Sequence, residues 1–359
     1  MRILSPILYF GLALFLSIHC YRNSLMDVDL LAYAGNVALA DTTNPVSIHT
    51  TVYNQPLTPH LRGTDGNDKQ AAILRRRASD PYYSALYLPY FSVKPLYVLS
   101  MQLAHRLGAN VVDASRMISA ASYFALAVVI WMYTESLLSA LILILPETMR
   151  LGQINEPDAM SVMLLLFGLW IVFIKRRDLG VLLLLISIWV RSDNVILCFF
   201  VLAYLLIAGR LQWKSAAALA LVAMGSVMTI SRYGYGWREL YYHTFLGGDP
   251  TGNPVFGPGD YFRALITGLN LAIHRTVPIF FLLFLVCFTV CRDRNIREVL
   301  SLVGLCSVVY FVVYPSYQPR YYGLFFLTTA IVAVRITSSS SVRPSTQGRL
   351  DARQVCDRP

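Results

Sequence analysis

Two aspartates, Asp27 and Asp29, are the first acidic residues of the chain and directly follow its first apolar segment. Alternate residues of an extended backbone point to the same side, so in a loop both carboxylates would face one ligand. The other interpretation is that one aspartate caps a helix, because an apolar stripe with helical spacing follows. That stripe consists of Leu30, Leu31, Ala34, Val37 and Ala38. The loop interpretation predicts acid–base chemistry or cation binding, and the cap interpretation predicts a structural role.

A second pair of acids, Glu156 and Asp158, flanks Pro157. Proline suits the first turn of a helix, which places both acids in that turn. In the structural interpretation they complement the positive end of the helix dipole. In the functional interpretation they form a second acidic edge of a pocket roofed by the Asp27–Asp29 loop.

Two arginines lie in apolar surroundings. Arg191 and Asp193 interrupt two apolar runs, and charges near membrane depth are costly unless they are paired or face a cavity. They predict either a local ion pair or an anion contact from Arg191.

Arg320 precedes Tyr321 in a segment rich in proline and tyrosine. It either grips the phosphate of a membrane lipid or snorkels to the head groups.

The composition identifies the environment of these residues. Of 359 residues, 56% are hydrophobic and 14% are charged, whereas soluble domains have about 25% charged residues. The mean hydropathy is +0.54, which predicts a membrane protein. The net charge of +10 is assigned to inside-facing loops and anionic ligands, and not to nucleic acid. No CxxC or HExxH motif occurs, so no zinc site is predicted.

The apolar segments predict an all-α fold, a polytopic α-helical membrane protein with about ten transmembrane helices. The first span is expected between Ile3 and His19. Further spans are expected at roughly 113–133, 136–149, 157–174, 178–190, 194–209, 215–231, 268–291, 298–314 and 321–335. Several are shorter than the roughly 20 residues of an ordinary span, and short helices are tolerated where they line a cavity.

Residues 21–112 contain no credible span and are expected to form a long first extracytoplasmic loop. Within it, the apolar segment from Pro95 to Leu107 is too short to cross a membrane and predicts an interfacial helix. With this loop outside, the inside segments at 175–177, 210–214 and 292–297 are all basic, as the positive-inside rule requires. Residues 1–335 therefore form one transmembrane domain, followed by a disordered, basic cytoplasmic tail at 336–359.

The order of several short motifs resembles the GT-C superfamily, the multi-spanning glycosyltransferases that use polyprenyl-phosphate sugars. The resemblance covers most of the chain. Its motifs are Asp27-Val28-Asp29, Lys94-Pro95-Leu96-Tyr97, Ala114-Ser115-Arg116, Glu156 and Asp158 after a Leu-Pro span end, Arg191-Ser192-Asp193, and Gln318-Pro319-Arg320-Tyr321. The sequence departs from the family pattern in one respect, since we expect no large soluble domain in it.

The resemblance implies that Asp27 or Asp29 is the catalytic acid of the first loop, and that Arg320 and Arg191 contact the donor phosphate. The substrate-binding residues implied in all are Lys94, Glu156, Asp158, Arg191, Arg320 and Tyr321. A divalent cation, Mg²⁺ or Mn²⁺, held by Asp27, Asp29 or Glu156 is compatible with this chemistry but not required by it.

The implied reaction moves a hexosyl or pentosyl group from a polyprenyl-phosphate donor to a glycan, lipid or protein acceptor of the cell envelope. The expected location is a bacterial inner membrane, with the active site outside and both termini in the cytoplasm. The alternative is a transporter or flippase for a lipid-linked or anionic solute, because short, broken helices and an intramembrane Arg191–Asp193 pair also occur in transporters.

Overall fold

The computed structural model describes residues 4–25, 28–54, 75–175, 178–246, 257–315 and 322–341. These residues are almost entirely helical, which confirms the all-α fold class. The extended pairing found among them is an isolated parallel bridge between Leu25 and Ile154.

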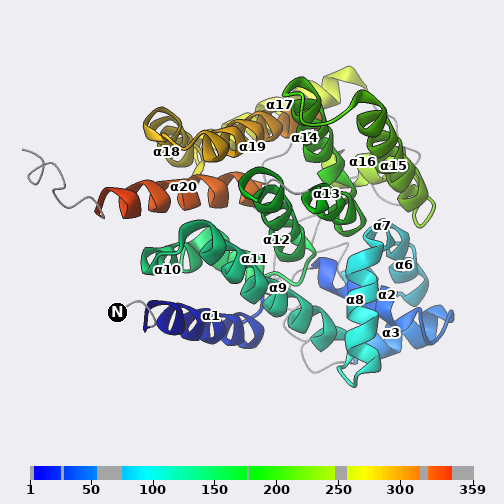
Figure 1. Cartoon of the computed structure of the whole chain (residues 1–359). Helices are drawn as coiled ribbons and strands as arrows, with labels where there is room; N and C mark the ends of the chain where they lie inside the picture. The colour runs from blue at the N-terminus through cyan, green and yellow to red at the C-terminus, as the bar shows by residue number, and fades with distance from the viewer. Residues whose placement is uncertain are drawn as a thin grey trace, which may run out of the picture.

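The first part of the chain is one long helix followed by short helices. They are α1 (Leu4–Arg22), α2 (Val28–Ala38), α3 (Pro45–Tyr53), α6 (Pro81–Ala85), α7 (Leu88–Ser92) and α8 (Pro95–Arg106). The helices α2 to α8 gather at one end of the molecule (Figure 1). There α2, α3, α7 and α8 share a core built around Tyr33, Tyr97 and Met101, and α6 packs against α3. We call these five helices the α2–α8 group. That α8 lies at a membrane interface stays a prediction.

The remaining elements form a bundle. They are α9 (Val111–Thr134), η1 (Leu137–Ser139), α10 (Ala140–Leu143), α11 (Pro146–Gln153), α12 (Asp158–Leu169), η2 (Trp170–Ile174), α13 (Leu179–Val190), η3 (Ser192–Asn194), α14 (Val195–Ile207), α15 (Trp213–Ser231), α16 (Trp237–Leu246), α17 (Pro258–Ile273), α18 (Val277–Val290), α19 (Arg294–Val313) and α20 (Gly323–Ser341). Figure 1 shows α1, α9, α19 and α20 running along the same general direction.

Among the described residues, four helices are long and apolar enough to cross a membrane: α1, α9, α15 and α19. A fifth crossing is possible for α17 and α18 together, which are bent by 73° at their junction. The apolar helices at 158–174, 179–190, 192–207 and 323–338 are shorter. The membrane character of the chain is therefore supported, and the total of ten spans stays a prediction.

Two of the expected spans are broken. In the segment 136–149, η1 and α10 end before Pro146, which begins α11; proline lacks the N–H that would continue the preceding helix. The segment 268–291 is divided between α17 and α18, with Pro278 in the first turn of α18. At the other end of the chain, α20 continues past the expected span to Ser341, into the segment expected as a tail; residues 342–359 lie outside the described residues.

Long-range contacts sort the helix ends into two groups. At one end, Arg335 donates to the carbonyl of Tyr133 at 2.9 Å and pairs with Asp293 at 3.1 Å, and Arg210 pairs with Glu298 at 3.5 Å. We call this the basic end. The first residues of α1 and the last of α20 lie on this side (Figure 1). The α2–α8 group lies at the opposite end (Figure 1), and the charged cluster described below adjoins it near Tyr33.

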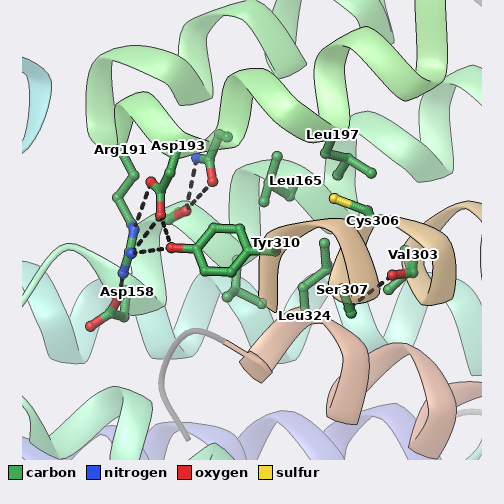
Figure 2. Close-up of a pocket in the computed structure, with 13 residues that line it drawn as sticks. Asp158, Leu165, Arg191, Asp193, Leu197, Val303, Cys306, Ser307, Tyr310 and Leu324 are labelled. Carbon is green, nitrogen blue, oxygen red and sulfur yellow. Dashed lines mark hydrogen bonds and ion pairs between the residues drawn. The ribbon is translucent and has the colours of Figure 1, made fainter. Parts of the chain in front are cut away.

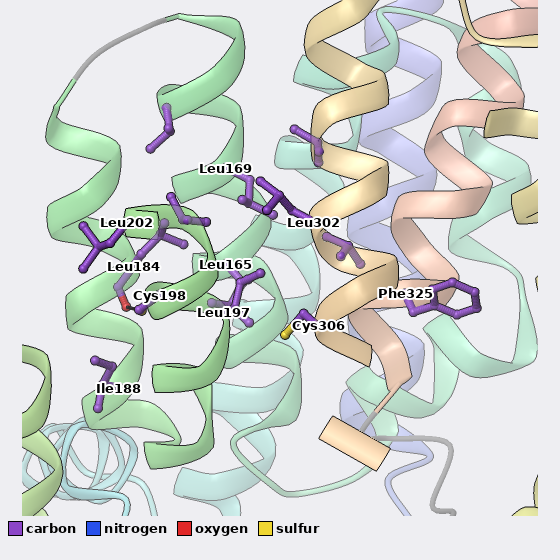
Figure 3. Packing of buried hydrophobic residues seen from close by; sticks show 14 of the residues in the cluster. Leu165, Leu169, Leu184, Ile188, Leu197, Cys198, Leu202, Leu302, Cys306 and Phe325 are labelled. Carbon is purple, nitrogen blue, oxygen red and sulfur yellow. Dashed lines mark hydrogen bonds between the residues drawn. The ribbon is translucent and has the colours of Figure 1, made fainter. Parts of the chain in front are cut away.

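The bundle core positions that cluster. Leu165, Leu184, Leu197 and Leu302 pack together between α12, α13, α14 and α19 (Figure 3). Glycines bring α12 and α13 close, because a Cβ on Gly180 would lie 2.6 Å from the Gly168 carbonyl oxygen. The close approach fixes α12 against α13, and hence the two helix ends from which Asp158 and Arg191 extend.

Candidate functional site

The two acidic motifs are held together by the backbone. Leu25 N–H donates to the Gln153 carbonyl at 2.8 Å, and the Asn155 side-chain amide donates to the Leu25 carbonyl at 3.0 Å. This bridge joins the end of α1 to the segment before α12. The two chain segments then turn into α2 and α12, whose first turns carry Asp29 and Asp158.

The structure places Asp29 in a helix rather than in an extended loop. α2 begins at Val28, and the predicted apolar stripe of this helix is confirmed, since Leu30, Leu31, Ala34, Val37 and Ala38 are all buried. Asp29 lies inside the first turn, where an acid complements the helix dipole, and not at the cap position, so helix capping by one of the two aspartates stays a prediction for Asp27. Asp27 lies outside the described residues, so the mutual orientation of the two aspartates stays a prediction.

Glu156 and Asp158 are almost completely buried, with exposed fractions of 3% and 1%. Tyr33 of α2 is buried beside them. Burial raises the pKa of the Tyr33 hydroxyl well above its usual range, and the carboxylates of Glu156, Asp29 and Asp158 raise it further. Carboxylates from both motifs thus raise the pKa of one tyrosine, which stays protonated and able to donate a hydrogen bond.

Lys94 approaches the same tyrosine from the start of α8. Its ammonium donates a hydrogen bond to the Tyr33 hydroxyl and lies 4.9 Å from the Tyr33 ring centroid and 5.3 Å from that of Phe91. Aromatic faces stabilise a cation at such distances. Lys94 therefore brings a positive charge to the acids of the two motifs.

Arg191 lies at the centre of a buried ion-pair cluster (Figure 2). Its Nε and Nη2 donate to the two oxygens of Asp193 at 3.2 and 2.7 Å, and its Nη1 donates to Asp158. Nη2 also lies 3.3 Å from the hydroxyl of Tyr310, which donates to Asp193. We call Asp158, Arg191, Asp193 and Tyr310 the Arg191 cluster. It joins the ends of α12, α13 and α19.

The local ion pair predicted for Arg191 and Asp193 is therefore present, and it also includes Asp158. Burial by itself raises the pKa of Asp193, but Arg191 and the Tyr310 hydroxyl lower it more strongly, with a contribution from Lys94, so that the pKa lies below its usual range. A side-chain network holds the turn behind this pair, because the Asn194 amide donates to Ser161 and to the Ser187 carbonyl, both at 2.9 Å.

A cavity of about 60 Å³ adjoins the Arg191 cluster. One side is polar and the floor is apolar (Figure 2). Its lining is Asp158, Ser161, Val162, Leu165, Arg191, Asp193, Asn194, Leu197, Val303, Cys306, Ser307, Tyr310 and Leu324. Polar groups converging on one side of an apolar cavity are typical of ligand sites.

The structure brings together five of the expected site residues, Asp29, Lys94, Glu156, Asp158 and Arg191. Asp27, Arg320 and Tyr321 lie outside the described residues, so their placement stays a prediction. Within the described part of the chain, no group of three or more His, Cys, Asp and Glu side chains is arranged to hold a metal ion. The predicted cation site that includes Asp27 stays a prediction.

Sequence reasoning missed Tyr33, Tyr310 and Asn155. Tyr310 and Tyr33 are tyrosines in apolar helices and look like ordinary interface or core residues. Asn155 stands between the singled-out Glu156 and the bridge residue Ile154, and its position inside an acidic motif was the one available signal.

No protein-family model, curated protein sequence or solved structure matches this chain.

Proposed function

We propose that the chain is a membrane glycosyltransferase that moves a sugar from a polyprenyl-phosphate donor to an acceptor of the cell envelope. The observation that carries the proposal is the meeting of two acidic motifs at one end of an apolar bundle. The carboxylates of Asp29, Glu156 and Asp158 all raise the pKa of Tyr33. Two cations contact the same group, Lys94 at Tyr33 and Arg191 at Asp158. Ionisable groups inside an apolar helix bundle mark functional sites by default.

In the proposed reaction, an acceptor hydroxyl oxygen attacks the anomeric carbon of the donor sugar. The bond from that carbon to the phosphate oxygen breaks, and the phosphate leaves with the electron pair. Asp27 or Asp29 accepts the proton of the acceptor hydroxyl. Arg320 stabilises the charge that develops on the leaving phosphate, with Tyr321 as an anchor at the interface. A Mg²⁺ or Mn²⁺ ion at Asp27, Asp29 or Glu156 is an optional part of this proposal.

The proposed topology puts the reaction on the outer side of a bacterial inner membrane. The basic end carries Arg210, Arg294 and Arg335 and would face the cytoplasm. The charged cluster and the α2–α8 group would then lie outside, where a lid over a lipid-linked donor is useful. The proposal includes ten crossings, with the shorter apolar helices counted as spans.

A transporter or flippase for a lipid-linked solute is the second candidate. It is favoured by the 73° bend between α17 and α18 and by the buried Arg191 cluster, since broken helices and buried charges mark substrate paths in transporters. The two candidates differ in their product: a flippase moves its substrate unchanged, whereas a transferase breaks the bond between sugar and phosphate.

Mass spectrometry of envelope glycans and glycolipids tests the proposal in cells. Cells lacking the protein are expected to lose one glycan or glycolipid species and to regain it with the wild-type gene. Complementation with Asp29→Asn and Asp27→Asn separates catalysis from the presence of the protein. An unchanged glycan and glycolipid profile in cells without the protein would contradict the proposal.

A further inference from the structure

The hydrogen-bond donors of Arg191 are largely occupied. Its guanidinium contacts both oxygens of Asp193, one oxygen of Asp158 and the Tyr310 hydroxyl. A guanidinium that grips a phosphate does so with two parallel N–H donors, and here the paired donors already hold Asp193. A phosphate would have to displace a buried carboxylate from its arginine, which leaves that carboxylate without its counter-charge.

The charge balance points the same way. Asp158 and Asp193 together outweigh the single positive charge of Arg191, and the low pKa of Asp193 keeps it ionised. Around the neighbouring Tyr33, Lys94 adds one positive charge, and Glu156 and Asp29 add negative charges. A phosphate entering the cavity would therefore meet net negative charge, whereas an uncharged hydroxyl group would not.

The cavity offers partners suited to hydroxyl groups. Carboxylates accept hydrogen bonds from hydroxyls. The Ser307 and Tyr310 oxygens, whose protons go to the Val303 carbonyl and to Asp193, line the space as further acceptors. The floor includes Leu165 and Leu197, which would pack against the C–H groups of a sugar ring. The volume of about 60 Å³ accommodates the edge of such a ring, since one water needs about 10–15 Å³ on this measure.

We infer that the Arg191 cluster binds hydroxyl groups of the sugar, and that Arg191 is a positioning residue that orients Asp158 and Asp193 rather than a contact to the donor phosphate. This inference rests on the proposed function, because it names the part of the donor that the cavity takes. Arg320 then contacts the phosphate of the donor, and the Arg191 cluster selects among sugars.

Binding to the purified full-length protein in detergent tests the inference without any need for turnover. The probes are a panel of methyl hexosides and methyl pentosides, with inorganic phosphate as the comparison, measured by calorimetry and by the shift in Tm. We expect at least one glycoside to bind and to raise Tm, and we expect any binding of phosphate to be unchanged in Arg191→Lys, because the phosphate contact is assigned to Arg320. The matching deoxy glycosides should bind more weakly, because a missing hydroxyl leaves its buried partner unpaired.

Two variants locate the site. Tyr310→Phe removes one hydroxyl and is expected to raise the Kd of the glycoside about five- to tenfold, and Ser307→Ala provides an independent loss of a lining hydroxyl. Tyr204→Phe is the matched control and should leave the Kd unchanged. Tyr204 lies at the basic end, where the Arg210 guanidinium carbon is 5.8 Å from the centroid of its ring.

The inference is overturned if no glycoside binds. It is also overturned if phosphate binds to the wild type but no longer binds to Arg191→Lys. A third contradicting result is the same glycoside Kd in Tyr310→Phe, Ser307→Ala and wild type. The proposed function fails separately. A protein that binds glycosides through Tyr310 but never releases polyprenyl phosphate from a donor has the sugar site without the transferase activity.

Discussion

Leu25 and Ile154 form a parallel bridge, and an acidic motif follows each of them at the same spacing along the chain. Asp29 follows Leu25 as Asp158 follows Ile154, and each aspartate lies in the first turn of a helix. The bridge thus sets two helix starts beside each other. Residues far apart in the sequence thereby contribute carboxylates to one neighbourhood, around Tyr33.

The stability of the protein should depend on Asp193 in a pH-dependent way. Its pKa is lowered in the folded state by Arg191 and Tyr310, which outweigh burial. A lowered pKa contributes stability that is complete above the ordinary aspartate pKa and is lost as the pH falls through the folded value. Asp193→Asn should therefore cost about 1.5–3 kcal/mol at neutral pH, and this difference should shrink on acidification below about pH 4.

Thermal unfolding of the wild type and Asp193→Asn across this pH range measures the difference. The control is Asp41→Asn, since Asp41 is exposed and pairs only with His105 at 3.1 Å among the described residues, and exposed pairs contribute about 0–1 kcal/mol. A gap between wild type and Asp193→Asn that widens toward acid pH would contradict the role assigned to Arg191.

The close crossing of α12 and α13 should not tolerate a methyl group. A Cβ on Gly180 would lie 2.6 Å from the Gly168 carbonyl oxygen and 2.7 Å from the Val172 nitrogen, so Gly180→Ala must push the helices apart. We expect a loss of about 1–3 kcal/mol, measured as a lower Tm.

Gly225 provides the matched control in α15, because nothing lies within 4 Å of a Cβ built there. Gly225→Ala should raise stability by about 0.5–1 kcal/mol through helix propensity alone. Equal Tm values for Gly180→Ala and Gly225→Ala would show that α12 and α13 do not cross so closely.

Several features followed from local rules that act within a few residues. The helix starting at Pro95, the buried stripe of α2 and the first-turn position of Asp158 were predicted and are confirmed. Proline position and apolar spacing suffice for such predictions. The first-turn position predicted for Glu156 is wrong, because α12 begins at Asp158 and Pro157 is its cap. The break before Pro146 was not predicted, because the apolar character of residues 136–149 was given more weight than the proline within them.

The partners within the site could not be predicted from spacing. Tyr310 donates to Asp193 across a separation of 117 residues, and Arg191 reaches Asp158 across 33. Only the packing of α19 against α14 and of α12 against α13 decides these contacts. An arginine in an apolar run indicates that some partner exists, but it does not say which carboxylate.

Arg320→Lys tests the proposed phosphate contact. A snorkelling arginine is replaceable by lysine, because either cation satisfies the interface, whereas an arginine that holds two phosphate oxygens is not. We expect a higher apparent KM for the lipid-linked donor with an unchanged Tm. A donor titration in one detergent measures it. Arg320→Lys and Arg320→Ala with the KM of wild type would assign Arg320 to topology.

The proposed membrane topology can be tested by replacing Ser79 or Ser215 with cysteine, in a background without other cysteines, and labelling the single thiol. Ser79 follows the basic run 75–77 and should react with an impermeant reagent from outside. Ser215, near the start of α15, should react only after the membrane is opened. Labelling of the residue-79 cysteine from the inside alone would refute the proposed outer location of the α2–α8 group.

The most direct measurement follows the donor in proteoliposomes that contain the purified full-length protein, a polyprenyl-phosphate sugar and envelope acceptors. The wild type is expected to release polyprenyl phosphate with time, and either Asp27→Asn or Asp29→Asn should slow this release by about 10²–10⁴-fold with an unchanged Tm. Donor that crosses the bilayer with its sugar still attached, in the wild type and both variants alike, would contradict the glycosyltransferase proposal and favour a flippase.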